Sequence, residues 1–214
     1  MVITIGGKYG SGGKAVAAKA AELLGYRLCS DDVITEAVKN SEFDMAEETF
    51  RYFDESQGQA ALSELARLSA AQRSSFIQEL DDGSIDVVPL GRAMTEIQDT
   101  ILNRLADEGN CILLGRCANH FLEGRSDVLS VYVMDDDENC VARIRKHFPE
   151  LSEKEAEKKI RKTNKRRSDY FSFFTGKNWG DVSNYGMVLN CALLGGPEKA
   201  AEYLAGAVRA MDQA

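Results

Sequence analysis

The sequence is poor in the residues that mark metal sites, disulfide scaffolds and membrane spans. Its 214 residues include two histidines and five cysteines, and the cysteines are scattered, odd in number and never in C-x-x-C spacing. This pattern argues against a zinc site or a disulfide framework, so we expect free thiols in a reducing compartment. The chain has neither a charged-then-apolar leader nor the roughly 20 apolar residues that a membrane helix needs. We therefore expect a soluble cytoplasmic protein.

The negative net charge restricts the partners of the chain. At −8, the average surface repels nucleic acid and anionic lipid, so we expect neither a nucleic-acid nor a membrane partner. Any anion site must then be a local basic patch. A length of 214 residues with 44% hydrophobic residues is enough for one large domain, or for one domain with an inserted lobe.

Glycine is concentrated near the start of the chain, between an apolar run at Val2–Ile5 and apolar positions at helical spacing from Val16. The five glycines of this stretch are Gly6, Gly7, Gly10, Gly12 and Gly13. The pattern predicts a strand, a loop and a helix, in which backbone amides and the helix N-terminus converge on a phosphate. The alternative is that the glycines serve close packing alone.

This loop departs from the standard phosphate-binding sequence G-x-x-x-x-G-K-[ST]. If Gly7 and Gly12 are the two glycines, Gly13 occupies the lysine position and Lys14 comes one residue late. The next residue, Ala15, has no hydroxyl. We expect Lys14 to approach the transferred phosphoryl group, and Ser11 to be a magnesium ligand in place of the missing hydroxyl.

Five strand-like segments alternate with helical patterns, as in a parallel sheet. They are Val2–Ile5, Tyr26–Cys29, Cys111–Leu114, Val128–Val133 and Met187–Asn190. One helix is predicted to end at Gly109, a second to follow the acidic run 135–138, and a third to begin at Pro197. We interpret the acidic run as helix capping, with metal binding as the minor alternative. Between about 40 and 90 the pattern is irregularly helical, with an apolar stripe through Phe76 and Ile77 and no strong strand signal, which predicts an inserted lobe.

Several charged residues follow the predicted strands. Arg116 comes just after the strand that ends at Leu114, where ligands bind in open α/β sheets, and the equal alternative is that it pairs with a carboxylate. After the second strand, Ser30 or Asp31 is expected to cap the next helix, and Asp31 or Asp32 is the candidate to bind the acceptor.

A helix with an unusual charge follows the capping box that begins at Ser152. It has seven cations in ten residues: Lys158, Lys159, Arg161, Lys162, Lys165, Arg166 and Arg167. A solvated helix face is the usual explanation, but such self-repulsion is also tolerated when the partner is a polyanionic phosphate.

Four segments together resemble the cytidylate kinase-like family, a bacterial branch of the P-loop nucleoside monophosphate kinases. They are ITIGGKYGSGGKAVAAKAAELLG, LLGRCANHFL, VLSVYVMDDDENCVARIRKH and TNKRRSDYFSFFTGKNWGDVSNYGMVLN. The resemblance implies an α/β fold of three layers and a single kinase-like domain over residues 1–214. Its parts are a core (1–39, 90–150 and 185–214), a helical acceptor lobe (about 40–90) and an arginine-rich lid (about 152–184).

The resemblance also implies ATP and Mg²⁺ as cofactors, together with site residues. The donor phosphates are assigned to Gly7, Tyr9, Gly10, Ser11, Gly12, Gly13, Lys14 and Ala15, the catalytic charges to Lys14, Arg161, Arg166 and Arg167, and the acceptor to Asp31, Asp32 and Arg116. The sequence departs from cytidylate kinases proper at Gly13, at Cys117, where they have an acid, and in the lid sequence KRRSDYF.

The function that these observations favour is ATP-dependent phosphoryl transfer to a nucleoside monophosphate, with CMP or a relative as acceptor. Two alternatives are a nucleotide-binding protein without kinase activity, which the departures around Gly13 favour, and a kinase of a non-nucleotide small molecule. RNA binding through the basic helix ranks last.

Overall fold

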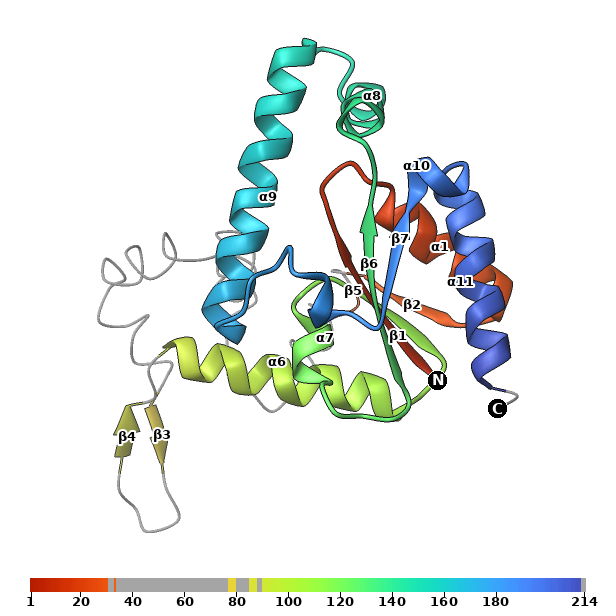
Figure 1. Cartoon of the computed structure of the whole chain (residues 1–214). Helices are drawn as coiled ribbons and strands as arrows, with labels where there is room; N and C mark the ends of the chain where they lie inside the picture. Colours follow the sequence, from red (N-terminus) through yellow and green to blue (C-terminus); the bar gives the residue numbers. More distant parts are fainter. Residues whose placement is uncertain (31–32, 34–76, 80–84, 88–89, 213–214) are drawn as a thin grey trace.

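The centre of the computed structural model, which describes residues 1–30, 33, 77–79, 85–87 and 90–212, is a five-stranded sheet (Figure 1). The strands run in the order β2-β5-β1-β6-β7, and each neighbouring pair is parallel. Their bounds are β1 Val2–Gly7, β2 Arg27–Cys29, β5 Cys111–Leu114, β6 Val128–Met134 and β7 Met187–Asn190. All five predicted strands are present, and the α/β fold class is confirmed.

Helices cover both faces of the sheet and give the molecule three layers (Figure 1). Their bounds are α1 Gly13–Leu24, α6 Leu90–Asp107, α7 Ala118–Phe121, α8 Asp137–His147, α9 Glu153–Thr175, α10 Cys191–Leu194 and α11 Pro197–Met211. Because side chains alternate between the faces of a strand, Ile3 and Ile5 of β1 pack with α1 and α11, whereas Val2 packs with α6 and α7. None of the described helices is long and apolar enough to cross a membrane.

One edge of the sheet collects the loops that form the site. Because the strands are parallel, the segments after β1, β5 and β6 leave the sheet at the same edge. The N-terminus lies at the opposite end of the molecule (Figure 1). The glycine-rich loop after β1, the Arg116 segment after β5 and Asp135 after β6 are therefore neighbours in space.

A short antiparallel hairpin corrects the sequence prediction for the inserted region. Its strands are β3 Ile77–Glu79 and β4 Ile85–Val87, with Ile77 opposite Val87 and Glu79 opposite Ile85. The predicted helical stripe through Ile77 is therefore wrong. The alternation of Ile85, Asp86 and Val87 is that of a strand, but three residues are too few to outweigh the surrounding helical pattern. The rest of the predicted lobe between 34 and 89 lies outside the described residues.

The long helix α9 is attached to the core near both of its ends. Ala156 and Ile160 pack with α8, and Tyr170 and Phe171 pack near Cys117. The helix extends past the edge of the sheet where the loop lies (Figure 1). The charged segment that the sequence predicted is thus a single helix of 23 residues.

The predicted capping box at the start of α9 is confirmed, and it leads to a stability prediction. The Ser152 hydroxyl accepts a hydrogen bond from the Glu155 amide (3.4 Å), and the Glu155 carboxylate accepts one from the Ser152 amide (2.8 Å). We expect Ser152→Ala to lower the free energy of unfolding by about 1 kcal/mol in urea titrations. The control is Ser168→Ala, in the middle of α9, whose side chain makes no hydrogen bond with a described residue. An equal loss in both variants would show that the cap is not the source.

Candidate active site

The glycine-rich loop between β1 and α1 ends in backbone amides that have no acceptor. Gly12 precedes α1 in a left-handed conformation (φ 91°), and no side chain caps the helix. The first backbone hydrogen bond of α1 runs from the Val16 amide to the Gly12 carbonyl at 2.9 Å. Within the described ranges, the amides of Gly13, Lys14 and Ala15 therefore donate to nothing. Such amides, together with the helix dipole, form an anion-binding site.

A buried hydroxyl group beside this helix terminus also lacks a partner, as does one within β1. Ser11 is fully buried and Thr4 is 2% exposed, and neither hydroxyl has a hydrogen-bond partner among the described residues. A buried hydroxyl without a partner is costly, and a ligand oxygen would remove that cost. The loop thus offers backbone amides and the Ser11 hydroxyl to one anionic ligand.

The glycines of the loop also allow close packing, so the alternative interpretation of the sequence is correct for part of their role. A Cβ atom on Gly7 would lie 2.1 Å from the Val133 carbonyl oxygen, and one on Gly12 would lie 2.4 Å from Cγ of Pro197. Gly13 is different, because a Cβ there would meet nothing closer than 3.9 Å. Packing therefore explains Gly7 and Gly12, but it does not explain why Gly13 stands at the lysine position.

A cavity of about 720 Å³ opens over the loop. This volume is typical of a site for a small molecule or a nucleotide. It is lined by residues 4–15, by residues 114–117 after β5, by Arg143, Ile144, His147 and Phe148 at the end of α8, by Arg167, Tyr170 and Phe171 of α9, and by Asn119, Trp179 and Tyr185. The loop therefore forms one wall, and α8 and α9 supply the others.

Two guanidinium groups from the helices hold the carbonyl oxygens of the loop. Arg143 of α8 donates to the Gly10 carbonyl at 2.8 Å, and Arg167 of α9 donates to the Gly7 carbonyl at 2.6 Å. Arg167 also lies 5.4 Å from the centre of the Tyr9 ring. Both arginines line the cavity, so two positive charges stand beside the place where the loop lacks a lysine.

Most of the predicted donor-binding and acceptor-binding residues that the structure describes lie at this cavity. All the loop residues assigned to the donor line it, and so does Arg116, which is 8% exposed. Lys14 lines the cavity but is exposed, and it makes no hydrogen bond or ion pair with any described residue. Cys117, which replaces the acid of the cytidylate kinases, is buried and also lines it. Asp31 and Asp32 lie outside the described residues.

The structure separates the three lid arginines that the sequence grouped together. Arg167 faces the loop. Arg161 and Arg166 are exposed, and neither is among the described residues that line the cavity. Arg161 instead pairs with Glu157 on the same helix at 3.4 Å. The cations at 161 and 166 thus belong to the solvated face of α9, in agreement with the usual explanation of such a run.

Three residues that contact the loop, or contact Arg143 beside it, were not identified from the sequence. They are Arg143, Asp135 and Asn164, whose side-chain oxygen accepts a hydrogen bond from the Tyr9 amide at 2.8 Å. Asp135 was assigned to helix capping with the acids that follow it, but it is 2% exposed and pairs with Arg143. For Asn164 and Arg167 a signal was present, because they lie three residues apart on the face of α9 that continues from Ile160.

Aromatic side chains form another wall of the cavity, where Tyr185 lies beside Gly6. The Tyr132 ring lies 4.8 Å from that of Tyr185 and 5.6 Å from that of Trp179, and the Tyr185 hydroxyl donates to the Trp179 carbonyl at 3.1 Å. Burial raises the pKa of Tyr185, so its phenol is neutral and remains a donor. The rings of Trp179 and Tyr185 pack onto the domain, and this packing makes them a wall of the site.

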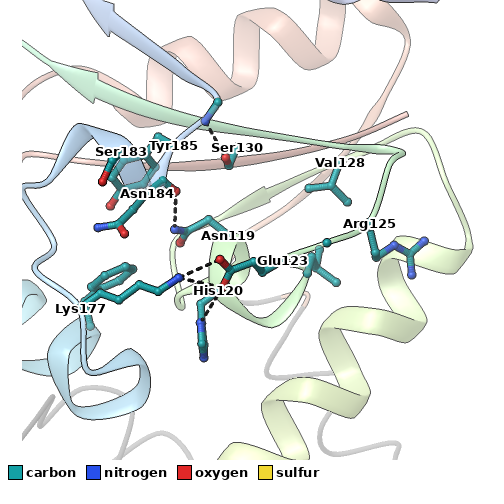
Figure 2. A pocket seen from close by; sticks show the side chains of 14 residues that line it. Asn119, His120, Glu123, Arg125, Val128, Ser130, Lys177, Ser183, Asn184 and Tyr185 are labelled. Atoms are coloured by element: carbon teal, nitrogen blue, oxygen red, sulfur yellow. Dashed lines mark hydrogen bonds and ion pairs between the residues drawn. The ribbon is translucent and has the colours of Figure 1, made fainter.

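Polar contacts around a second, smaller cavity fix the segment that carries this wall (Figure 2). Lys177 reaches both carboxylate oxygens of Glu123 at 2.8 Å, and the Asn119 amide donates to the Asn184 carbonyl at 3.4 Å. Figure 2 shows these contacts joining residues 177–184 to Asn119 of α7 and to Glu123, which follows α7. Asn119, Phe171 and Tyr185 line both cavities, so the two are separated by one shared wall.

Comparisons with known proteins agree with this geometry. The model of the cytidylate kinase-like family matches residues 2–192. Among solved structures, an uncharacterised protein from Eubacterium ventriosum has a TM-score of 0.68 at 19% identity, with 98% of each chain covered. Shikimate kinase from Bacteroides thetaiotaomicron has a TM-score of 0.51 at 12% identity, with 100% of this chain and 99% of that chain covered.

A third structure, TT1252 from Thermus thermophilus, has a TM-score of 0.50 at 20% identity over 99% of this chain and 97% of its own. At these identities the likeness shows the fold, which is that of the P-loop kinases as predicted. None of the curated protein sequences compared with the chain matches it.

Proposed function

The chain belongs to the cytidylate kinase-like family, and from this premise we propose that it transfers the terminal phosphoryl group of ATP to a nucleoside monophosphate, with a CMP-like acceptor. The observation that supports the proposal most directly is the set of backbone amides at the start of α1. There the amides of Gly13, Lys14 and Ala15 have no acceptor among the described residues, beside the buried and unpartnered hydroxyl of Ser11. Amides in this arrangement bind phosphate.

The proposed reaction is an in-line displacement. A phosphate oxygen of the acceptor attacks the terminal phosphorus of ATP, the bond from that phosphorus to the bridging oxygen breaks, and ADP leaves. The loop amides hold the donor phosphates, and Lys14 and Arg167 stabilise the negative charge on the transferred group. Arg116 binds the acceptor phosphate, and the aromatic wall at Tyr185 and Trp179 contacts the acceptor ring.

The residues of the loop fit both ATP and one ligand position of magnesium. The Ser11 hydroxyl is the one orphaned oxygen within the loop itself, so it would hold magnesium as a single protein ligand. When bound, magnesium would neutralise negative charge on the donor phosphates. Among the described residues there is no group of three or more acids, histidines or cysteines that would hold the ion independently of the nucleotide.

A coupled ADP-release assay tests the proposal. CMP, dCMP, UMP and AMP are offered as acceptors with ATP and Mg²⁺, and shikimate and simple sugars extend the panel to non-nucleotide acceptors. We expect turnover with CMP or dCMP to exceed the rate without acceptor by at least about 100-fold. Turnover with a non-nucleotide alone would reassign the acceptor. ATP binding in calorimetry without transfer to any acceptor would favour a nucleotide-binding protein and end the kinase proposal.

A further inference from the structure

Asp135 is a buried charge that the proposed reaction does not use directly. Its side chain is fully buried, it follows the last residue of β6, and it is not among the residues that line the cavity. Its carboxylate accepts hydrogen bonds from Asn139 at 2.9 Å, from the Asp136 amide at 2.8 Å and from Arg143. Burial by itself raises the pKa of Asp135, but these hydrogen bonds hold it below its ordinary value. The group is therefore a permanent anion at neutral pH.

Arg143 connects this anion to the glycine-rich loop. One terminal nitrogen of its guanidinium contacts Asp135, and the other donates to the Gly10 carbonyl. A planar guanidinium held at both nitrogens has a fixed position and orientation. Gly10 has a left-handed φ of 87°, and a Cβ there would lie 2.9 Å from the Cys140 carbonyl oxygen, so α8 touches the loop at this residue. The guanidinium carbon also lies 3.8 Å from the Cβ position of Gly12.

We propose that Asp135 and Arg143 form a positioning pair that fixes the conformation of the loop for the donor phosphates. The proposal rests on the proposed function for its effect on ATP, because it gives a second source for the fixed positive charge that the loop lacks at Gly13. Asp135 acts only through Arg143, since it is buried away from the cavity. Lysine cannot replace Arg143, because one ammonium group cannot hold the carboxylate and the carbonyl in the same planar geometry.

The test uses conservative variants and a matched control on the same helix. Arg143→Lys keeps the charge and Asp135→Asn keeps the shape, so both avoid leaving a bare buried charge. Arg145→Lys is the control, because Arg145 is exposed on α8, contacts only the Leu151 carbonyl (3.3 Å) among the described residues and lies outside the cavity lining. The two readouts are ATP affinity by calorimetry and hydrogen–deuterium exchange of the peptide that spans residues 6–16.

We expect Arg143→Lys and Asp135→Asn each to weaken ATP binding about tenfold and to speed loop exchange about tenfold, while the KM for the acceptor stays unchanged. The double variant is expected to lose no more than either single variant, because both act through one contact. Arg145→Lys should leave both readouts at their wild-type values.

The two proposals fail in different ways. If the wild-type protein binds no ATP and transfers no phosphate, the proposed function fails, and loop exchange still decides on the positioning pair. Loop exchange at the wild-type rate in both variants would overturn the pair, as would additive losses in the double variant or an equal effect of Arg145→Lys.

Discussion

Replacing Gly7 with alanine is expected to cost about 3 kcal/mol or more of the free energy of unfolding. Gly7 is the last residue of β1 and pairs in register with Val133 of β6. The added Cβ would lie 2.1 Å from the Val133 carbonyl oxygen, which is a backbone atom in the middle of the sheet and has no room to move. The φ of 154° at Gly7 adds strain for any residue that carries a Cβ. Because domains are stable by only about 5–15 kcal/mol, this loss is a large fraction of the total.

The measurement is urea unfolding followed by far-UV circular dichroism, with Gly13→Ala as the matched control. Gly13 lies six residues further along the chain, but a Cβ there meets only the Val133 side chain at 3.9 Å, and its φ is not positive. As the first residue of α1, it should tolerate alanine without loss, and helix propensity offers a gain of up to about 1 kcal/mol. Wild-type stability of Gly7→Ala, or an equal loss in Gly13→Ala, would contradict the packing explanation of these glycines.

The sheet and most of its helices follow from local patterns that the sequence displays. A strand that is buried on both faces has a continuous apolar sequence. In β5, Ile112 and Leu113 are both fully buried, so no polar residue interrupts the run. Gly109 and Ser152 marked helix boundaries that the structure confirms, because capping depends on a few consecutive residues. The hairpin of β3 and β4 was missed because three-residue strands are defined by their partners rather than by their own periodicity.

The site was only partly predictable, because its contacts join segments that are distant in the sequence. The glycines identified the loop that forms one wall of the cavity, since a glycine-rich turn between a strand and a helix is a local feature. Arg143, in contrast, contacts a carbonyl 133 residues before it, and no spacing rule connects the two. Asp135 stands in a run of acids that resembles an ordinary helix start, and only the burial of its side chain separates it from Asp136 and Asp137.

The run of cations in α9 shows how helical geometry decides which charge faces the glycine-rich loop. The sequence alone did not distinguish the seven positive residues from one another, but only one face of the helix contacts the loop. Ile160 and Tyr170 are buried on that face, and Arg167 lies on it between them, seven residues after the one and three before the other. Lys165 and Arg161 project from the opposite side and pair with acids of α9 itself.

This geometry leads to the largest expected effect on activity, which is that of Arg167→Ala. Arg167 lines the cavity, donates to the Gly7 carbonyl at 2.6 Å and lies over the Tyr9 ring, so it is placed to stabilise charge on the transferred phosphoryl group. Under the proposed function we expect kcat/KM to fall about 100- to 1,000-fold in the ADP-release assay, as when one fixed donor to a transition-state charge is removed. Most of the loss should be in kcat, because charge develops on that group only during transfer.

Arg161→Ala and Arg166→Ala are the matched controls, since they remove the same group from the same helix on its exposed face. Exposed charges of this kind contribute little, so we expect kcat/KM within about twofold of the wild-type value in both. Arg167→Lys should recover part of the activity, because the positive charge is kept while the donation to the Gly7 carbonyl loses its fixed geometry. If all three alanine variants lose activity equally, the cations act together through the field of the helix. The assignment of the catalytic charge to the inner face of α9 would then be wrong.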